Sequence, residues 1–285
     1  MPHGSRRIGR VEVVALCDGV VLASEPFEES FPGVQAETVA TARERYPDTF
    51  AGERWQLHVH AFLVRSAGRT VLLDTGVGPE SAPAFPWSGI RGALPDELAA
   101  AGVAPADVDE VLITHLHDDH LGWNVAEGNT EPMFPNARYV LHRADWDLYL
   151  AEGDDEDLAI FDAVVRPLET AGQLELVTGD SFPVTDELTF VHAPGHTPGH
   201  QVLLIDSGDG RAILTGDTVN HPAQLLQPGL PGSSDFWPEI AAATRAAWLE
   251  RIEREGRLVS TSHFPEPFGR FDREGDHRIW VPETD

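Results

Sequence analysis

A chain of 285 residues, 41% hydrophobic and 24% charged, is long enough to bury a full core and has no apolar run that could cross a membrane, so we expect one globular domain over residues 1–285. Its formal net charge of −27 would repel phosphate backbones and anionic lipids, which argues against nucleic acids and membrane surfaces as partners. All 20 basic residues are arginine, and the absence of lysine excludes Schiff-base chemistry and P-loop nucleotide hydrolysis.

The first predicted element is a strand over residues 11–17. Basic residues precede this apolar stretch, as they do in a signal peptide, but Glu12 and Asp18 interrupt it, so we expect a cytoplasmic location. Cys17 is the single cysteine, which rules out an internal disulfide, and its place in the strand predicts a buried, unreactive thiol.

Residues 24–55 form a long segment without a clear period. Its aromatic residues, set among charges, are Phe27, Phe31, Tyr46, Phe50 and Trp55. A loop of this length inside a compact domain is often a lid or a substrate-binding insertion. The alternative is a helix-containing edge segment packed on the core, and the sequence leaves both open.

A hairpin is predicted next, from strands at 57–65 and 70–74 on either side of Ala67-Gly68. Further strands are predicted at 110–114, 138–141, 188–192, 201–206, 211–215 and 257–261. Helices are predicted at 93–101, 143–151, 156–171 and 238–255. The core-facing stripe of the last helix is interpreted as Ile240, Ala243, Ala247, Trp248 and Ile252. Alternating strands and helices indicate an α/β or α+β fold.

The most informative motif directly follows the apolar run Val111-Leu112-Ile113. It contains three histidines and two aspartates within six residues, His115-Leu116-His117-Asp118-Asp119-His120. Burying these groups without a partner would be costly, and a metal ion would pair them. In an extended segment His115 and His117 point the same way and can hold one ion. A turn permitted by Gly122 would present Asp119 and His120 to a second ion.

Three other apolar runs also end in side chains that can bind a metal. They lead to His196, Asp217 and His263. Ligands carried on rigid strand ends can be held within the tolerances of a metal site. A lone histidine or aspartate at a strand end is usually structural, and it is the recurrence at four strand ends that indicates a metal centre.

As a set, these residues resemble the motifs of the metallo-β-lactamase superfamily, over about residues 74–264. The resemblance implies an α+β fold, a four-layer αββα sandwich with the site at one edge. It implies that His115, His117 and His196 bind one ion, that Asp119, His120 and His263 bind the other, and that Asp217 bridges them. Zinc is the expected ion, although iron, manganese and cobalt also suit these ligands.

Four more residues are candidates for orienting the ligands or contacting substrate. Asp74, in Asp74-Thr75-Gly76, resembles the family carboxylate that accepts the second N–H of a ligand histidine. His200 is either a similar support or a surface histidine at a strand start. Asn220 stands where the well-known lactonases of the family carry a tyrosine, three residues beyond the bridging aspartate. His221 is either a substrate contact or a structural residue before Pro222.

The predicted function is a dinuclear-metal hydrolase that uses a metal-bound hydroxide to cleave an ester or lactone bond of a small molecule. Asp119 or Asp217 would orient the nucleophile and carry its proton to the leaving group. With no cysteine near position 217, β-lactam hydrolysis is disfavoured.

The alternatives to this function are a phosphotriesterase-type or thioester hydrolase and, in a different class, a noncatalytic metal-dependent ligand-binding protein. Apolar residues of 24–55 and Phe85-Pro86-Trp87 are candidates to line the substrate pocket. A homodimer is compatible with the sequence.

Overall fold

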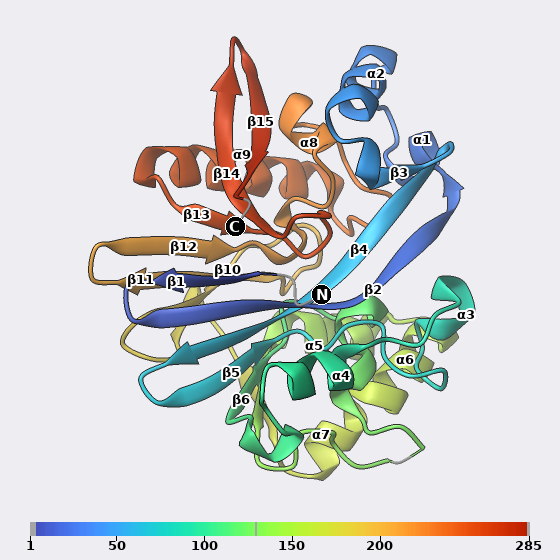
Figure 1. Ribbon diagram of the computed structural model, residues 1–285. Coiled ribbons are helices and arrows are strands. Elements are labelled where there is room, and N and C mark those ends of the chain that lie inside the picture. Colours follow the sequence, from blue (N-terminus) through green and yellow to red (C-terminus); the bar gives the residue numbers. More distant parts are fainter. Residues whose placement is uncertain (1–3, 129, 284–285) are drawn as a thin grey trace.

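The computed structural model describes residues 4–128 and 130–283 and shows two β-sheets packed face to face, with helices covering both outer faces. In Figure 1 the layers run from α9 at the top, through the two sheets, to α4–α7 at the bottom. This is the αββα sandwich that the resemblance predicted. No helix among the described residues is long and apolar enough to span a membrane.

The first sheet is built mainly from the N-terminal half of the chain. Its strands are β1 (Ser5–Ile8), β2 (Val11–Pro26), β3 (Phe50–Ala51), β4 (Arg54–Ser66), β5 (Arg69–Leu73), β6 (Glu110–Leu112), β7 (Arg138–His142) and β8 (Leu174–Val177). They follow the order β1-β2-β4-β5-β6-β7-β8, with β3 paired to β4. Pairing is parallel from β5 to β8, so β5, β6 and β7 end at the same edge.

The second sheet is built from the C-terminal half. Its strands are β9 (Ser181–Pro183), β10 (Leu188–His192), β11 (Gln201–Ser207), β12 (Gly210–Leu214), β13 (Leu258–Ser260), β14 (Phe268–Glu274) and β15 (His277–Pro282). They follow the order β15-β14-β13-β12-β11-β10-β9. Only β12 and β13 pair in parallel within this sheet as described, which brings the residues after these two strands to one edge.

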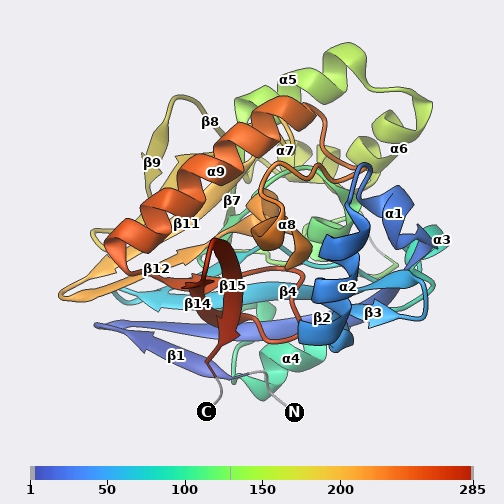
Figure 2. The ribbon, with the colours of Figure 1, turned by 90° about the horizontal axis from the view of Figure 1, so that it is seen from above.

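Helices cover the outer faces of the sandwich. They are α1 (Phe27–Ser30), α2 (Ala36–Arg45), α3 (Phe85–Ser88), α4 (Leu94–Ala100), α5 (Arg143–Glu152), α6 (Asp155–Val164), α7 (Arg166–Thr170), α8 (Ala223–Leu226) and α9 (Pro238–Glu255). Helices α4–α7 share one core with the first sheet. Helix α9 lies across the second sheet, and Trp248, Leu249 and Ile252 pack on β11–β13 (Figure 2).

The central core lies between the sheets, because alternate residues of each strand point inward. Val11, Val13 and Ala15 of β2 are fully buried there, opposite Phe190 and Leu203 of the second sheet. Cys17 continues this inward row but is half-buried, so the prediction of a buried residue was wrong. Burial of the thiol still raises its pKa to about 11, which keeps it protonated and poorly nucleophilic.

Two helix predictions were wrong. The expected helix at 156–171 breaks at Val165 into α6 and α7, because Pro167 has no N–H to donate and its ring clashes with the preceding helical turn. In α9 the buried residues are Ala241, Arg245, Trp248, Leu249 and Ile252. The predicted stripe is therefore correct at Trp248 and Ile252 and wrong at Ile240, Ala243 and Ala247, which are exposed. Ala241, Arg245 and Leu249 face the interior instead.

The segment 24–55 contains the end of β2, then α1, α2, a 3₁₀ turn at Pro47–Thr49, and β3. Phe27 and Phe31 are buried in a separate cluster with Ala223 and Leu230, close to α8. The segment therefore contains helices, and its role as a lid or a substrate-binding insertion stays a prediction. Parts of the same segment also line the cavity described below.

Candidate metal centre

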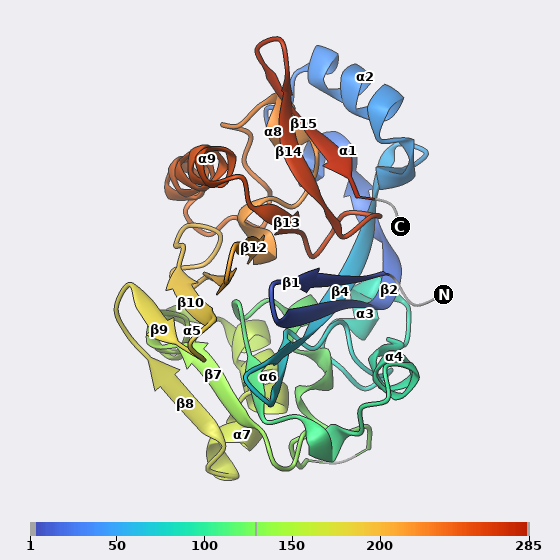
Figure 3. The same ribbon diagram turned by 60° about the vertical axis from the view of Figure 1, so that its left-hand side comes forward.

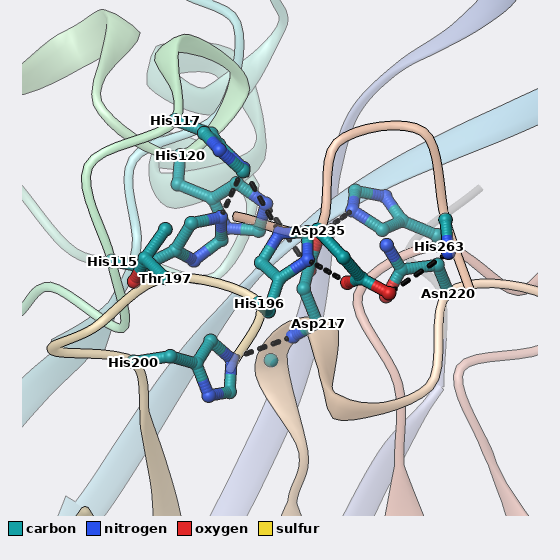
Figure 4. A network of polar contacts seen from close by, with 12 residues as sticks. His115, His117, His120, His196, Thr197, His200, Asp217, Asn220, Asp235 and His263 are labelled. Carbon is teal, nitrogen blue, oxygen red and sulfur yellow. Dashed lines mark hydrogen bonds and ion pairs between the residues drawn. The ribbon is translucent and has the colours of Figure 1, made fainter. Parts of the chain in front are cut away.

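Side chains from both sheets meet at one edge of the sandwich (Figure 4). The His115–His120 motif follows β6 of the first sheet. From the second sheet, His196 follows β10, Asp217 lies in a 3₁₀ turn at Gly216–Thr218 after β12, and His263 follows β13. Parallel pairing of β12 with β13 explains why Asp217 and His263 are neighbours although 46 positions separate them.

The local fold of the motif is an extended segment that ends in a turn. His117 is extended, with φ −78° and ψ 147°, and a 3₁₀ turn at Asp118–His120 follows it. This turn, rather than Gly122, redirects the chain. Gly122 is needed for a close approach instead, since a Cβ there would lie 2.1 Å from the carbonyl carbon of Val77.

Three histidines form the first group of candidate ligands. His117 Nδ1 lies 3.0 Å from His115 Nε2 and 2.9 Å from His196 Nε2. The three rings meet nearly edge to face, at 79° to 87°. Their nitrogens therefore surround one point from three directions, as in a metal site with three imidazole ligands.

Asp119, His120 and His263 form the second group. Asp119 Oδ2 lies 3.7 Å from Nε2 of His120 and 3.7 Å from Nε2 of His263. Asp217 contacts both groups: Oδ1 is 3.3 Å from His120 Nε2, and Oδ2 is 3.3 Å from His196 Nε2 and 3.0 Å from His263 Nε2. A carboxylate in this position can bridge two ions.

The hydrogen bonds at the outer ring nitrogens decide which nitrogen faces the centre. Nδ1 of His120 contacts Asp74 Oδ2 at 2.8 Å, Nδ1 of His196 contacts Asp235 Oδ1 at 2.8 Å, and Nδ1 of His263 contacts the His58 carbonyl at 2.8 Å. Each acceptor requires an N–H at Nδ1. Each Nε2 then faces the shared centre, where a metal ion can take its lone pair in place of a proton.

His115 follows the same pattern through a hydroxyl. Its Nδ1 lies 3.0 Å from Thr114 Oγ1, which in turn donates to Asp74 Oδ2 at 2.8 Å. Burial, reinforced by the neighbouring imidazoles, lowers the pKa of both His115 and His117 well below its ordinary value. Both rings are therefore neutral at neutral pH and can act as ligands.

The buried donors and acceptors fit a pair of cations. Lone pairs of several imidazoles face one another at about hydrogen-bond distance, which is repulsive unless a positive charge lies between them. Within residues 4–128 and 130–283, His120 Nε2 and Asp217 Oδ1 are buried and make no hydrogen bond of good geometry, apart from their 3.3 Å contact with each other. Four candidate metal-binding triads were found in this part of the chain, and three of them are made of these ligands.

Asp217 is suited to remain an anion at this centre. Burial by itself would raise the pKa of this carboxyl group, but the charges of His263 and His120 hold it well below its usual range. The backbone N–H of Asp217 donates to His200 Nε2 at 2.9 Å. His200 is fully buried and its Nδ1 contacts the Ala193 carbonyl at 3.1 Å, so it supports Asp217, and the surface alternative for it was wrong.

Asp74 serves two ligands at once. Its Oδ1 accepts the Thr114 N–H at 2.8 Å, while Oδ2 accepts from His120 and from the Thr114 hydroxyl. Its φ of 60° lies in the left-handed region, which is strained for a residue with a side chain. The surrounding hydrogen bonds hold this conformation and aim the carboxylate at the ligands.

The other two candidates lie in different surroundings. Asn220 lines the cavity beside the metal ligands, and its backbone N–H donates to Gln224 Oε1 at 2.8 Å. His221 is fully buried among aromatic rings, with Phe27 at 4.7 Å between ring centroids, and its Nε2 lies 2.9 Å from Thr49 Oγ1. The structure thus places His221 behind the cavity wall, where it packs as a structural residue.

Asp235 is a functional residue that the sequence analysis missed. Its Oδ1 holds His196, and its Oδ2 accepts the Gly232 N–H at 2.8 Å and lies 3.5 Å from a guanidinium nitrogen of Arg245. Arg245 is 1% exposed and also donates to the carbonyls of Thr218 and Leu230. No motif marks this loop, and an aspartate after two serines is the sole local signal.

A cavity of about 300 Å³ opens onto the centre. Its polar floor includes Asp119, Asp217 and His263, and its apolar wall comes from Phe31, Trp55, Leu57 and Trp87. The indole N–H of Trp87 donates to Asp118 Oδ2 at 2.7 Å, which anchors this wall beside the metal ligands. No arginine lines the cavity, although Glu25 and Asp118 do.

Comparisons with known proteins agree with this geometry. The family model of the metallo-beta-lactamase superfamily matches residues 54–263. An N-acyl homoserine lactonase of Bacillus sp is 27% identical over 226 residues, which cover 74% of this chain and 83% of the relative. The N-acyl homoserine lactonase AttM of Rhizobium radiobacter is 27% identical over 244 residues, 78% of this chain and 88% of the relative.

Solved structures share the fold over nearly the whole chain. The dizinc quorum-quenching lactonase AidC, in complex with its product, superposes with a TM-score of 0.83 at 23% identity and covers 99% of this chain and 97% of its own. The hydrolase AbOPH superposes with a TM-score of 0.84 at 22% identity, covering 100% and 98%.

Proposed function

The chain belongs to the metallo-β-lactamase superfamily, and from this membership and its site we propose that it is a dinuclear-metal lactonase with N-acyl homoserine lactones as its substrate class. The observation that carries the proposal is the convergence of imidazole nitrogens on Asp217, from both sheets, beside an apolar cavity. The names of the relatives, which are N-acyl homoserine lactonases, supply the substrate class.

In this proposal His115, His117 and His196 hold one ion, Asp119, His120 and His263 hold the other, and Asp217 bridges them. Zinc suits this set of imidazole and carboxylate ligands. When bound, the two ions supply a water of lowered pKa and a Lewis acid for the substrate carbonyl.

Asp119 is the better candidate for carrying the proton. Its carboxylate lies 3.7 Å from two imidazoles, whereas Asp217 contacts three imidazoles and its pKa is held well below its usual range. Asp119 accepts the proton of the attacking water and delivers it to the ring oxygen as the carbonyl carbon–oxygen bond breaks. The product is the open hydroxy acid, so the reaction consumes water and releases one proton to solvent.

The cavity wall is suited to an acyl chain. Phe31, Trp55 and Trp87 form an apolar surface that ends at the metal ligands. A volume of about 300 Å³ is in the range of small-molecule sites, so the lactone ring can lie on the ligands while the chain covers the aromatic rings. A neutral substrate also avoids repulsion by Glu25 and Asp118.

Asn220 takes the position in which the well-known lactonases carry a tyrosine. Its side-chain N–H can donate to the substrate carbonyl, which would assist the reaction without a phenol. Asparagine is neutral and reaches less far than tyrosine, so this feature also favours a second candidate, hydrolysis of aryl esters or phosphotriesters.

The test is proton release by zinc-reconstituted protein with N-acyl homoserine lactones, aryl esters and phosphotriesters. A higher kcat/KM for the lactones supports the proposal. A higher kcat/KM for the aryl esters or the phosphotriesters would assign that class as the substrate instead. Two bound ions with no turnover of any substrate would contradict hydrolysis and favour a noncatalytic metal-dependent binding protein.

A further inference from the structure

A second group of metal-competent side chains lies outside the centre described above, where β2 and β4 run side by side (Figure 1). Cys17 of β2 pairs with His60 of β4, and His58 lies two residues before His60 on the same face. One ligand atom from each of the three residues lies within 4.8 Å of the other two. We refer to these three residues as the Cys17 group.

His60 already has the tautomer of a metal ligand. Its Nδ1 lies 3.1 Å from the Ser262 carbonyl, which can only accept, so Nδ1 carries the proton and Nε2 keeps its lone pair. The side chain is buried, with 1% of the residue exposed. The rings of His58 and His60 lie nearly parallel, at 8°, with centroids 6.0 Å apart.

The thiol supplies a softer ligand than any residue of the dinuclear centre. Cys17 is the single cysteine of the chain, and its Sγ points to the Gly19 carbonyl at 3.6 Å, next to a bulge in β2. One thiolate and two imidazoles are a donor set that zinc accepts in tetrahedral sites. Such a site leaves a fourth position for water.

One residue of the Cys17 group, His58, borders a surface cavity. A cavity of about 530 Å³ is lined by His58 and, on its walls, by the carboxylates of Asp48, Glu266 and Glu283. It lies near both ends of the described chain, which Figure 3 shows on the same side of the molecule. Arg6 also lines it and lies 3.7 Å from Glu283, so two carboxylates remain to attract a divalent ion.

We propose that Cys17, His58 and His60 bind a third divalent ion of the zinc class, separate from the dinuclear centre. Zinc–ligand bonds of about 2.0 to 2.3 Å place tetrahedral ligand atoms roughly 3.3 to 3.8 Å apart, so the side chains move by about 1 Å to close on the ion. The Cys17 thiol loses its proton to solvent as the sulfur–metal bond forms.

The position gives this ion a structural role at the active centre. The Ser262 carbonyl accepts from the backbone N–H of His60 at 3.0 Å, and His263 Nδ1 contacts the His58 carbonyl at 2.8 Å. An ion on the Cys17 group would tie β2 to β4 directly behind His263. It would therefore stabilise the strand that orients this ligand of the dinuclear centre.

Cobalt titration of the metal-free full-length protein tests the proposal. The candidate ligands of the dinuclear centre are nitrogen and oxygen, so a thiolate-to-cobalt charge-transfer band in the near ultraviolet can arise only from Cys17. We expect this band to saturate at three ions per monomeric chain. Cys17→Ser should lose the band and the third ion while keeping two ions, and His60→Gln should weaken the third ion at least tenfold.

Two results would overturn the proposal. One is full cobalt loading with no thiolate band. The other is a band that appears only in a dimer fraction on gel filtration, because Cys17 would then bind the ion between chains. Either result leaves the dinuclear hydrolase intact, since none of its ligands belongs to the Cys17 group.

Discussion

Replacing Asp235 by asparagine should weaken zinc binding at His196 by about 10- to 100-fold, which corresponds to about 1.4 to 2.8 kcal/mol. The charged acceptor lies 2.8 Å from His196 Nδ1, and both side chains are nearly fully buried. Asparagine can still accept this N–H with its oxygen. Its amide nitrogen must then face the Gly232 N–H and the Arg245 guanidinium, which are both donors.

The measurement is competition for zinc between the protein and a chromophoric chelator at neutral pH. Asp276→Asn, an exposed position in the turn between β14 and β15, is the matched control and should bind zinc like the parent protein. Asparagine is preferred to alanine at position 235, because alanine would leave Arg245 buried without its ion pair, at about 3 to 5 kcal/mol of folding free energy. Unchanged affinity for both ions in Asp235→Asn would refute this reasoning.

Three further predictions concern the cavity, the fold and pH. Trp87→Ala should raise KM for long acyl chains about tenfold, with kcat nearly unchanged, because the indole is part of the apolar wall that contacts ground and transition states alike. An equal change in KM for long and short acyl chains would contradict this. Gly122→Ala should lower the melting temperature sharply because its Cβ would lie 2.1 Å from a backbone carbon, whereas Gly229→Ala, where nothing lies within 4 Å, should not. Zinc affinity at His196 should rise with pH up to about 9 and then level off. Burial lowers the pKa of His196, but hydrogen bonds to Asp217 and Asp235 outweigh it and raise this pKa to about 9, so protons compete with zinc below that value. An affinity independent of pH from 6 to 9 would exclude this competition.

The candidate ligands could be read from the sequence because their signals are local. An apolar run that ends in His115, Asp217 or His263 marks a strand and its end within a few residues. The structure brings these side chains together, together with Asp74 as the acceptor for His120. Pairing of β12 with β13, which joins distant segments, was not predicted, because no local pattern reports it.

A charged residue that is buried could not be predicted from the local sequence, and neither could a strand pair interrupted by charges. Arg245 of α9 faces the protein interior, where it links Asp235 to the loop carbonyls, and no apolar pattern in the helix marks this inward cation. The hairpin β14–β15 was missed because charged residues interrupt β14, while its buried large apolar side chains are Phe268, Phe271 and Trp280. In both cases tertiary partners decide the structure and no local pattern reports them.

Proton release on a pH-stat with N-hexanoyl homoserine lactone tests the central claim most directly, using zinc-reconstituted protein, a chelated sample and Asp217→Asn. We predict one proton released per lactone opened by the reconstituted protein, with loss of nearly all turnover in both controls. Equal rates in the chelated sample, or no lactone opening with two ions bound, would contradict a dinuclear lactonase.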